Sequence, residues 1–396
     1  MNNKIYWIWL QNALKYGSHK VRTINLLYEN IQKFYNAREK EWRLCGCFTN
    51  KEISSLLEST VQKAAAILDR SVSLGYQIIT LEDKDYPQKL KSIVNPPCVL
   101  YINGDISNID KKLCVSIVGT RNATLYGMQT AFEMAYNLAK EGVIIISGGA
   151  LGIDRSAHSG ALRAGGETMA VLGCGINCKY LAENGPLRRE ISKTGALISE
   201  YPPDLPAFFS NFPIRNRIIS GLSSGTVVIE AGAKSGSLIT ANLASSQYRD
   251  VFAVPVGKES PVSQGTFSLI RGGAKVVTCA QDILNEYNIK GKNINFQKEK
   301  EETINSCYKP VIAKPAANKN AAPEIKFAYN NESAVDSLSE ECKNVYLSIK
   351  KTGKSHIDQI SVNTNIHIKN LLSIITQLEI CGFIKSYPGK MYAAKQ

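Results

Sequence analysis

Residues 143–154 of the chain have the sequence Val143-Ile144-Ile145-Ile146-Ser147-Gly148-Gly149-Ala150-Leu151-Gly152-Ile153-Asp154. An uninterrupted β-branched run followed by a Gly-rich turn predicts a strand that is buried on both faces, as in a parallel sheet. A helical pattern from Ile153 to Ala164 follows the turn. The stretch therefore predicts a strand, turn and helix whose turn lies at the carboxyl end of the strand.

Apolar runs of the same kind occur throughout residues 75–287, separated by helical patterns and Gly-rich turns. The predicted strands are residues 115–118, 143–146, 168–172, 196–198, 226–229 and 251–254. Short β-branched runs that alternate with helices are typical of a parallel sheet with crossover helices. We therefore expect an α/β domain over residues 75–287.

The segments on either side of this central part differ from it in hydrophobic pattern and composition. Residues 1–74 carry apolar side chains at intervals of three and four, which predicts a small helical domain, of the SAM or helix-hairpin-helix kind. Residues 288–336 are polar and poor in aromatics, which is typical of a linker. Residues 337–396 show three helical patterns and then a strand-turn-strand around Pro388-Gly389, which suggests a winged-helix domain.

Composition points to an intracellular protein with an anionic partner. The 396 residues contain 47 Lys plus Arg against 34 Asp plus Glu, a formal charge of +13. Such a charge favours nucleic acid, acidic lipid or a phosphorylated ligand, although a Lys-rich composition alone would also produce it. The ten Cys are scattered and no run of ~18 apolar residues occurs, so we expect reduced cytoplasmic surroundings and no membrane span. The Cys pairs lack a second pair at zinc spacing, so we expect no metal.

Gly-rich turns follow several of the predicted strands. They are residues 119–124, 147–154, 173–175 and 230–237. Glycines let backbone N–H groups approach a phosphate, and a helix N-terminus favours negative charge. One such turn is more often plain turn geometry, but several at one sheet edge suit a polyanion. The G-G-x-x-G spacing of Gly148, Gly149 and Gly152 differs from the dinucleotide fingerprint G-x-G-x-x-G, so we expect no nucleotide cofactor.

Residues 209–221 combine aromatic, basic and amide side chains between two predicted strands. Proteins hold single-stranded nucleic acid in this way, with Arg on phosphates and a ring stacked on a base. In the alternative interpretation, Phe208, Phe209 and Phe212 are core residues, and Arg215 or Arg217 pairs with Glu200 or Glu230. We expect one of the two arginines to be structural.

Catalytic motifs are weak. His19, His356 and His367 lie outside the α/β region, and His158 falls within a predicted helix, where packing is its expected role. The triplet Gly353-Lys354-Ser355 lacks the first glycine of a P-loop, and no Gly-x-Ser-x-Gly elbow is present. We therefore expect a binding protein with no catalytic residues.

Taken together, the ordered motifs of the central region resemble the DNA-processing protein A (DprA, also Smf) family. The matching stretches are Gly119-Thr120-Arg121, residues 147–154 with Ala157-His158, Ser199-Glu200-Tyr201-Pro202, residues 212–223, Val228-Ile229-Glu230-Ala231, residues 235–241 and Val251-Phe252-Ala253-Val254-Pro255. The resemblance implies an extended Rossmann-like domain that binds single-stranded DNA, a homodimer, and loading of RecA recombinase during transformation. It also implies a helical N-terminal domain and a C-terminal winged helix.

The resemblance, with the turns and the block described above, predicts a set of DNA-facing residues. They are Arg121, Gly148, Gly149, Ala150, Lys179, Phe212, Arg215, Asn216, Arg217, Lys234, Ser235, Gly236 and Ser237. The chain departs from the family pattern at Tyr180-Leu181, Pro255-Val256 and Gly265-Thr266-Phe267, which affects loops near the expected groove. Lys369 is nearly the only positive charge on the predicted third helix of the winged helix, so we expect protein contact there rather than reading of a duplex.

Two other functions remain open from the sequence. The first is a Rossmann-type nucleotide N-glycosidase of the lysine-decarboxylase-like group, although its Pro-Gly-Gly-x-Gly-Thr motif is absent. The second is a protein adaptor in which the terminal domains dock partners and DNA binding is incidental.

Overall fold

The computed structural model describes residues 3–257, 260, 262–289, 340–364, 366, 367, 371, 374, 375, 378, 383–387 and 391–394. The chain divides into two compact units, residues 1–295 and 296–396. The predicted linker over residues 288–336 lies outside the described residues, apart from its first two positions.

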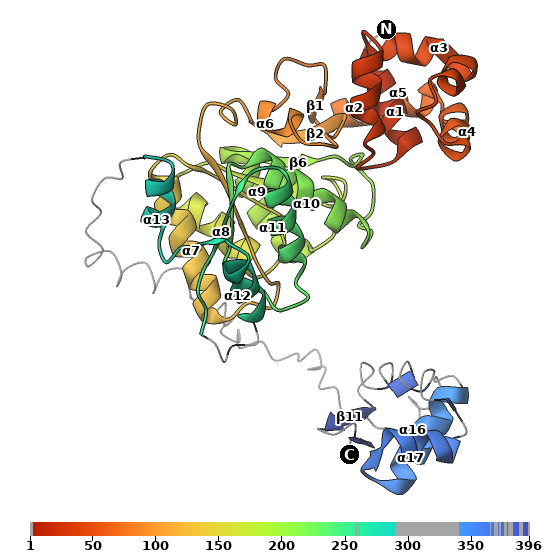
Figure 1. Ribbon diagram of the computed structural model, residues 1–396, viewed down its shortest axis with the longest axis vertical. Coiled ribbons are helices and arrows are strands. Elements are labelled where there is room, and N and C mark those ends of the chain that lie inside the picture. The colour runs from red at the N-terminus through yellow and green to blue at the C-terminus, as the bar shows by residue number, and fades with distance from the viewer. Residues whose placement is uncertain are drawn as a thin grey trace, which may run out of the picture. The chain divides into compact units, whose positions relative to one another are not determined.

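Five helices form the N-terminal part of the first unit (Figure 1). They are α1 (Asn3–Leu14), α2 (Lys20–Leu27), α3 (Ile31–Leu44), α4 (Asn50–Glu58) and α5 (Val61–Ser73). Thr49 and Glu52 form a capping box that starts α4, and the hydroxyl of Thr60 accepts a backbone bond that starts α5. The rings of Trp9, Phe34 and Trp42 pack together at the centre of these helices.

The rest of the first unit is built on a nine-stranded sheet of order β1-β2-β6-β5-β4-β3-β7-β8-β9. The strands are β1 (Gln77–Thr80), β2 (Val99–Gly104), β3 (Cys114–Val118), β4 (Ile144–Ser147), β5 (Thr168–Leu172), β6 (Ala196–Ser199), β7 (Gly225–Val228), β8 (Asp250–Ala253) and β9 (Lys275–Val276). The run from β6 to β9 is parallel, which confirms the expected α/β architecture. The expectation of a parallel sheet is wrong at one edge, where β2 pairs antiparallel with both β1 and β6.

Helices cover both faces of this sheet. They are α6 (Gln88–Lys91), α7 (Leu125–Lys140), α8 (Ile153–Arg163), α9 (Gly185–Thr194), α10 (Asn211–Leu222), α11 (Gly236–Ser246), α12 (Gln264–Arg271) and α13 (Ala280–Glu286), with a short 3₁₀ turn η1 (Ala182–Asn184). Val115 and Ile117 point into one core with α7 and α8. Cys114 and Val118 point into the opposite core with α10 and α11, as the two-residue period of a strand requires.

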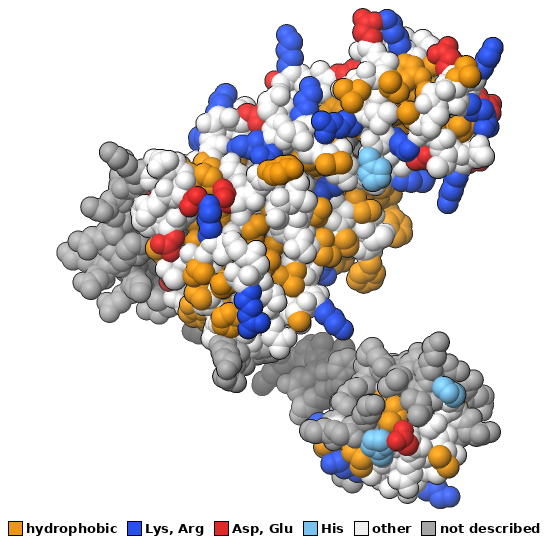
Figure 2. Space-filling view, in the orientation of Figure 1, with side chains coloured by type: hydrophobic (Ala, Val, Ile, Leu, Met, Phe, Trp, Pro, Cys, Tyr) orange, Lys and Arg blue, Asp and Glu red, His pale blue; other side chains and the backbone are white. Residues whose placement is uncertain are grey.

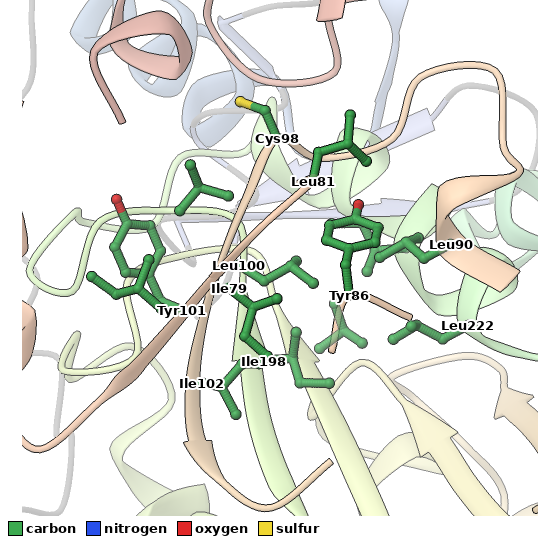
Figure 3. Close-up of a cluster of buried hydrophobic side chains, with 14 of the residues drawn as sticks. Ile79, Leu81, Tyr86, Leu90, Cys98, Leu100, Tyr101, Ile102, Ile198 and Leu222 are labelled. Atoms are coloured by element: carbon green, nitrogen blue, oxygen red, sulfur yellow. The ribbon is translucent and has the colours of Figure 1, made fainter. Parts of the chain in front are cut away.

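The antiparallel edge joins the N-terminal helices to the sheet through one continuous core. Ile79, Leu100 and Ile198 come from three neighbouring strands and meet Leu222 of α10 (Figure 3). The Tyr86 hydroxyl donates a hydrogen bond to the carbonyl of Pro97 over 2.7 Å and so closes the connection between β1 and β2. Neither β1 nor β2 was among the predicted strands.

The order of the strands fixes where a ligand can bind. From β3 the chain adds β4, β5 and β6 on one side and later β7, β8 and β9 on the other. The direction in which successive strands are added to the sheet therefore reverses between β3 and β7. In open α/β sheets, the carboxyl ends of the two strands at such a point flank the usual binding crevice.

The second unit contains α16 (Glu340–Thr352), α17 (Ile357–Thr364) and a small antiparallel sheet. Its strands are β10 (Ser355–His356), β11 (Ile384–Tyr387) and β12 (Met391–Ala394), in the order β10-β12-β11. Val345, Ile360 and Leu378 share its core. Lys369 and the predicted Pro388-Gly389 turn lie outside the described residues.

The surface carries charge of both signs. On the face shown in Figure 2, Lys and Arg side chains are interspersed with Asp and Glu over the N-terminal helices. No helix in the described part of the chain is long and apolar enough to span a membrane.

Candidate functional site

The carboxyl end of β3 and the Ser235 turn, which follows β7 in the chain, border a hollow of about 400 Å³. Its walls come from the turn after β3, the first turns of α10 and the start of α11. Arg121, Phe212 and Ser235 therefore line one space although they lie far apart in the sequence. This hollow lies at the crevice that the strand order predicts.

Two further hollows continue from the first one. A small one shares Arg121, Phe212 and Arg215 with it and reaches the Gly148 turn after β4. A third hollow, of about 350 Å³, shares the segment of Tyr180 and Leu181 with the small one. We call this row of three hollows the groove. The middle hollow has a volume of only about 10 Å³, so the row consists of two larger hollows with a narrow space between them.

Phe212 is the aromatic centre of the groove. The guanidinium of Arg121 lies 5.2 Å from the centre of the Phe212 ring, and that of Arg215 lies 5.9 Å from it. The ring of Tyr180 approaches the same ring, with centres 5.3 Å apart. Arg121 is exposed, so its charge is available at the surface of the groove.

Arg215 is held within the protein. Only 4 % of it is exposed, and its Nη1 donates hydrogen bonds to the carbonyls of Gly148, over 2.7 Å, and Val171. These bonds tie α10 to the ends of β4 and β5. Burial lowers the pKa of the Arg215 guanidinium, while the nearby Asp154 carboxylate opposes this effect.

Arg217 is structural, in agreement with the expectation for one of the two arginines. Its Nη2 forms an ion pair of 2.6 Å with Glu200, and both side chains are buried. Arg217 does not line any of the three hollows. The pairing with Glu200 was one of the alternatives considered from the sequence.

Two of the backbone amides that were predicted to meet a phosphate at the Gly148 turn are already bonded within the protein. The carboxylate of Asp154 accepts the N–H of Gly148 over 3.1 Å and that of Ala150 over 3.3 Å. A Cβ on Gly148 would stand 2.7 Å from this carboxylate and 2.8 Å from the Arg215 guanidinium, so glycine is required. Burial raises the pKa of Asp154, and Arg215 partly opposes that shift.

A carboxylate also fills the turn after β3. Glu230, which is fully buried, accepts the N–H of Thr124 over 2.9 Å and its hydroxyl over 2.5 Å. The Thr124 hydroxyl in turn caps α7 by accepting the N–H of Gly127. A negative side chain already occupies the positive end of α7. At two of the Gly-rich turns, the protein's own carboxylates thus accept some of the backbone amides.

The remaining predicted residues are distributed along the groove. Ser235 caps α11 and, with Gly236 and Ser237, lines the first hollow, while Lys234 is exposed in the turn before them. Asn216 joins α10 to α11 through a 3.3 Å bond to the Gly236 carbonyl. The positions at the other hollows are Gly149 and Ala150 in the small one and exposed Lys179 in the third.

His158 is a packed core residue, as its place in a helix predicted. It is fully buried on α8, and its Nδ1 forms a 2.8 Å hydrogen bond with the hydroxyl of Thr168. Burial lowers its pKa to about 3, with a further contribution from Arg215.

The alternative in which the Phe residues of this block are all core residues is wrong. Phe209 is 87 % exposed and Phe208 51 % exposed, and Phe209 lines the first hollow. Tyr180, Arg188 and Asp154 also line these hollows, and none of them was predicted to face the ligand. Asp154 and Glu230 could have been suspected, since each carboxylate stands within a few residues of a strand end and next to a Gly-rich turn. Arg188 carries no such signal, because it reaches the third hollow from within α9.

Comparison with known proteins identifies a family over the same region. The family model described as DNA recombination-mediator protein A matches residues 77–288. DNA processing protein DprA of Bacillus subtilis is 40 % identical over 240 residues, which cover 61 % of this chain and 80 % of that protein. Protein Smf of Synechocystis is 29 % identical over 402 residues, 99 % of this chain and 98 % of that protein.

A solved structure supports the same assignment. The X-ray structure of DNA processing protein A from Streptococcus pneumoniae is similar with a TM-score of 0.62 at 30 % identity. The similarity covers 72 % of this chain and 98 % of that one.

Proposed function

The chain belongs to the DNA recombination-mediator protein A (DprA/Smf) family, and from this premise we propose that it binds single-stranded DNA along the groove. The observation that carries the proposal is the exposed guanidinium of Arg121 lying over the ring of Phe212 in a row of connected hollows. A fixed cation beside an aromatic ring suits a ligand that repeats a negative charge and a flat base.

The carboxylates at these two turns change the mode of phosphate binding that the sequence suggested. Because Asp154 and Glu230 occupy backbone amides at two turns, we propose that side-chain cations provide the main phosphate contacts. The candidates are Arg121, Lys179 and Lys234, which are all exposed. Gly148, Gly149, Ala150, Arg215, Asn216 and the Ser235 turn then shape the groove, and Arg217 supports it from outside.

Salt dependence tests the proposal directly. Each phosphate contact releases counterions, and the slope of log affinity against log salt is about −0.7 per contact for single strands. We expect Arg121→Ala to weaken binding of a labelled oligothymidylate and to make this slope shallower by about one contact. Arg22→Ala, at an exposed position on α2, is the matched control. A salt-independent affinity, or equal loss in both variants, would refute the proposal.

We further propose that the protein protects incoming DNA and delivers it to RecA recombinase in transformation, as a homodimer and without doing chemistry on the strand. The description of the matching family as a recombination mediator supports a role in delivery. The buried position of His158 and the absence, among the described residues, of a His/Cys/Asp/Glu cluster able to hold a metal support a binding role. Buried cysteine side chains such as those of Cys98, Cys114 and Cys174 support a cytoplasmic location.

We propose that residues 1–74 form the helical domain, residues 75–287 the extended Rossmann-like domain and residues 288–336 the linker. The second unit is proposed to be a winged-helix domain that contacts protein. In the second unit, two helices, the three-stranded sheet and a common core support the winged-helix assignment. Filament formation by RecA on coated single strands, with and without residues 338–396, would test the role in delivery. Retained DNA binding with lost filament formation is expected.

A further inference from the structure

An unusual aromatic pair stands at the entrance of the first hollow. Phe209 is 87 % exposed and Phe208 is 51 % exposed in the segment that leads into α10. The N–H of Asn211 donates to the carbonyl of Phe208 over 3.0 Å and holds this segment in a tight turn. A large apolar ring in water forgoes most of its burial free energy, so its exposure calls for a function.

The two rings differ in their relation to the groove. Phe209 lines the first hollow together with Arg121 and Phe212, whereas Phe208 does not line it. Ile239, which is 41 % exposed on α11, lines the same hollow. A nucleobase has two flat apolar faces and therefore fits a space that offers both an aromatic and an aliphatic side chain.

The charges at the bottom of the hollow determine which side of a strand can enter it. Asp154 lines this hollow, and its carboxylate already accepts the amides of the Gly148 turn. Arg215 lines the same hollow, but its guanidinium is buried beside Asp154 and bonded to the carbonyls of Gly148 and Val171. A phosphate at that place would therefore meet a carboxylate of like charge and no free cation. Arg121, by contrast, is exposed and can meet phosphates at the rim.

We propose that Phe209 is a base-stacking residue and that a bound single strand turns its bases into the first hollow while its phosphates stay outside with Arg121. This inference rests on the proposed function and adds to it the orientation of the strand and a specific residue for the base. The ligand class is an unpaired nucleobase, so a duplex, whose bases are already stacked and paired, is excluded from this contact.

The test uses the full chain and a labelled oligothymidylate. Base stacking is worth ~1–3 kcal/mol per base by truncation, which corresponds to a loss of roughly 5- to 150-fold. We expect Phe209→Leu to weaken binding at least about fivefold and Phe208→Leu, the matched control, to bind like the unmodified protein. Phe209→Trp should retain binding because it keeps an aromatic face.

Phe209→Trp also reports the contact by fluorescence. The chain's three tryptophans, Trp7, Trp9 and Trp42, are all buried in the N-terminal helices, so a new indole at 209 gives a separate exposed signal. We expect oligothymidylate to quench this signal and an oligomer of abasic sites to leave it unchanged. Normal binding by Phe209→Leu, or an indole signal that does not respond to bases, would overturn the inference while leaving the proposed function intact. No binding by the unmodified protein would overturn both.

Discussion

Arg217 and Glu200 form an ion pair at 2.6 Å in which both side chains are only 3 % exposed. Glu200 directly follows β6, and Arg217 lies in the middle of α10, so the pair joins this helix to the antiparallel side of the sheet. A Cβ on Gly17 would approach the Arg217 side chain at 3.7 Å, which places the segment between α1 and α2 next to the pair. The pair thus lies where the helix of the groove meets the N-terminal helices.

Arg217→Met is expected to destabilise the protein by about 3–5 kcal/mol, because it leaves a buried carboxylate without its partner. Urea unfolding of both proteins measures the difference. Lys193→Met, which removes an exposed ion pair with Glu190, should cost less than about 1 kcal/mol. An equal effect of the two substitutions would show that Arg217 contributes no more than a surface residue.

Glu230→Gln tests whether the buried carboxylate holds the start of α7. A glutamine can accept one of the two hydrogen bonds from Thr124, but its amide N–H₂ group cannot accept the other. The expected loss is about 0.5–1.5 kcal/mol of unfolding free energy, since one hydrogen bond from Thr124, which is itself exposed, is lost. Glu190→Gln at an exposed site is the control, and thermal unfolding monitored by circular dichroism is the measurement.

The parallel part of the fold was predictable because its strands are mostly apolar and glycine directly follows β3, β4 and β5. The run at 168–172 coincides with β5, and the helix expected from Ile153 begins at that residue. The antiparallel edge was not predictable in the same way, because β1 and β2 gain their stability from tertiary packing against α10 and the N-terminal helices.

The candidate site was predictable in its location but not in its electrostatics. Strand ends and glycines placed Arg121, Phe212 and Ser235 at one edge, and the structure brings them to one hollow. Sequence spacing does not reveal that Asp154 folds back onto the Gly148 amides, since that contact depends on the turn at Gly152, whose φ is +74°. Exposure of Phe209 was equally hidden, because an aromatic residue between two strands is more often buried.

The pH dependence of stability should contain a contribution from His158. Its pKa is about 3 in the folded protein and 6.5 as an unperturbed group, so between these values the unfolded state binds one more proton. Stability is therefore lost as the pH falls from 6.5 towards 3, with a slope of up to ~1.4 kcal/mol per pH unit from this group. Unfolding of His158→Asn across this range should show a shallower pH dependence than the unmodified protein, and parallel curves would contradict the assignment.

Gly148→Ala should disturb the contact between the turn after β4 and α10. The added methyl group would meet both the Asp154 carboxylate and the Arg215 guanidinium at less than a normal contact distance. We expect a destabilisation of about 1–3 kcal/mol, as for overpacking in other buried sites. Gly236→Ala is the control because nothing lies within 4 Å of its added Cβ, and denaturant unfolding compares the two.

Separation of the two units provides a last test. Residues 1–295 and 296–396 form separate compact units, and each has its own hydrophobic core. A protein that ends at residue 295 should therefore unfold at nearly the same denaturant concentration as the first unit of the full chain, since the core residues of that unit all precede residue 295. It should also keep its salt-dependent affinity for oligothymidylate, because the three hollows of the groove lie entirely within that unit. A large loss of affinity in this protein would mean that the second unit itself contacts the strand, which contradicts its proposed role in protein contact.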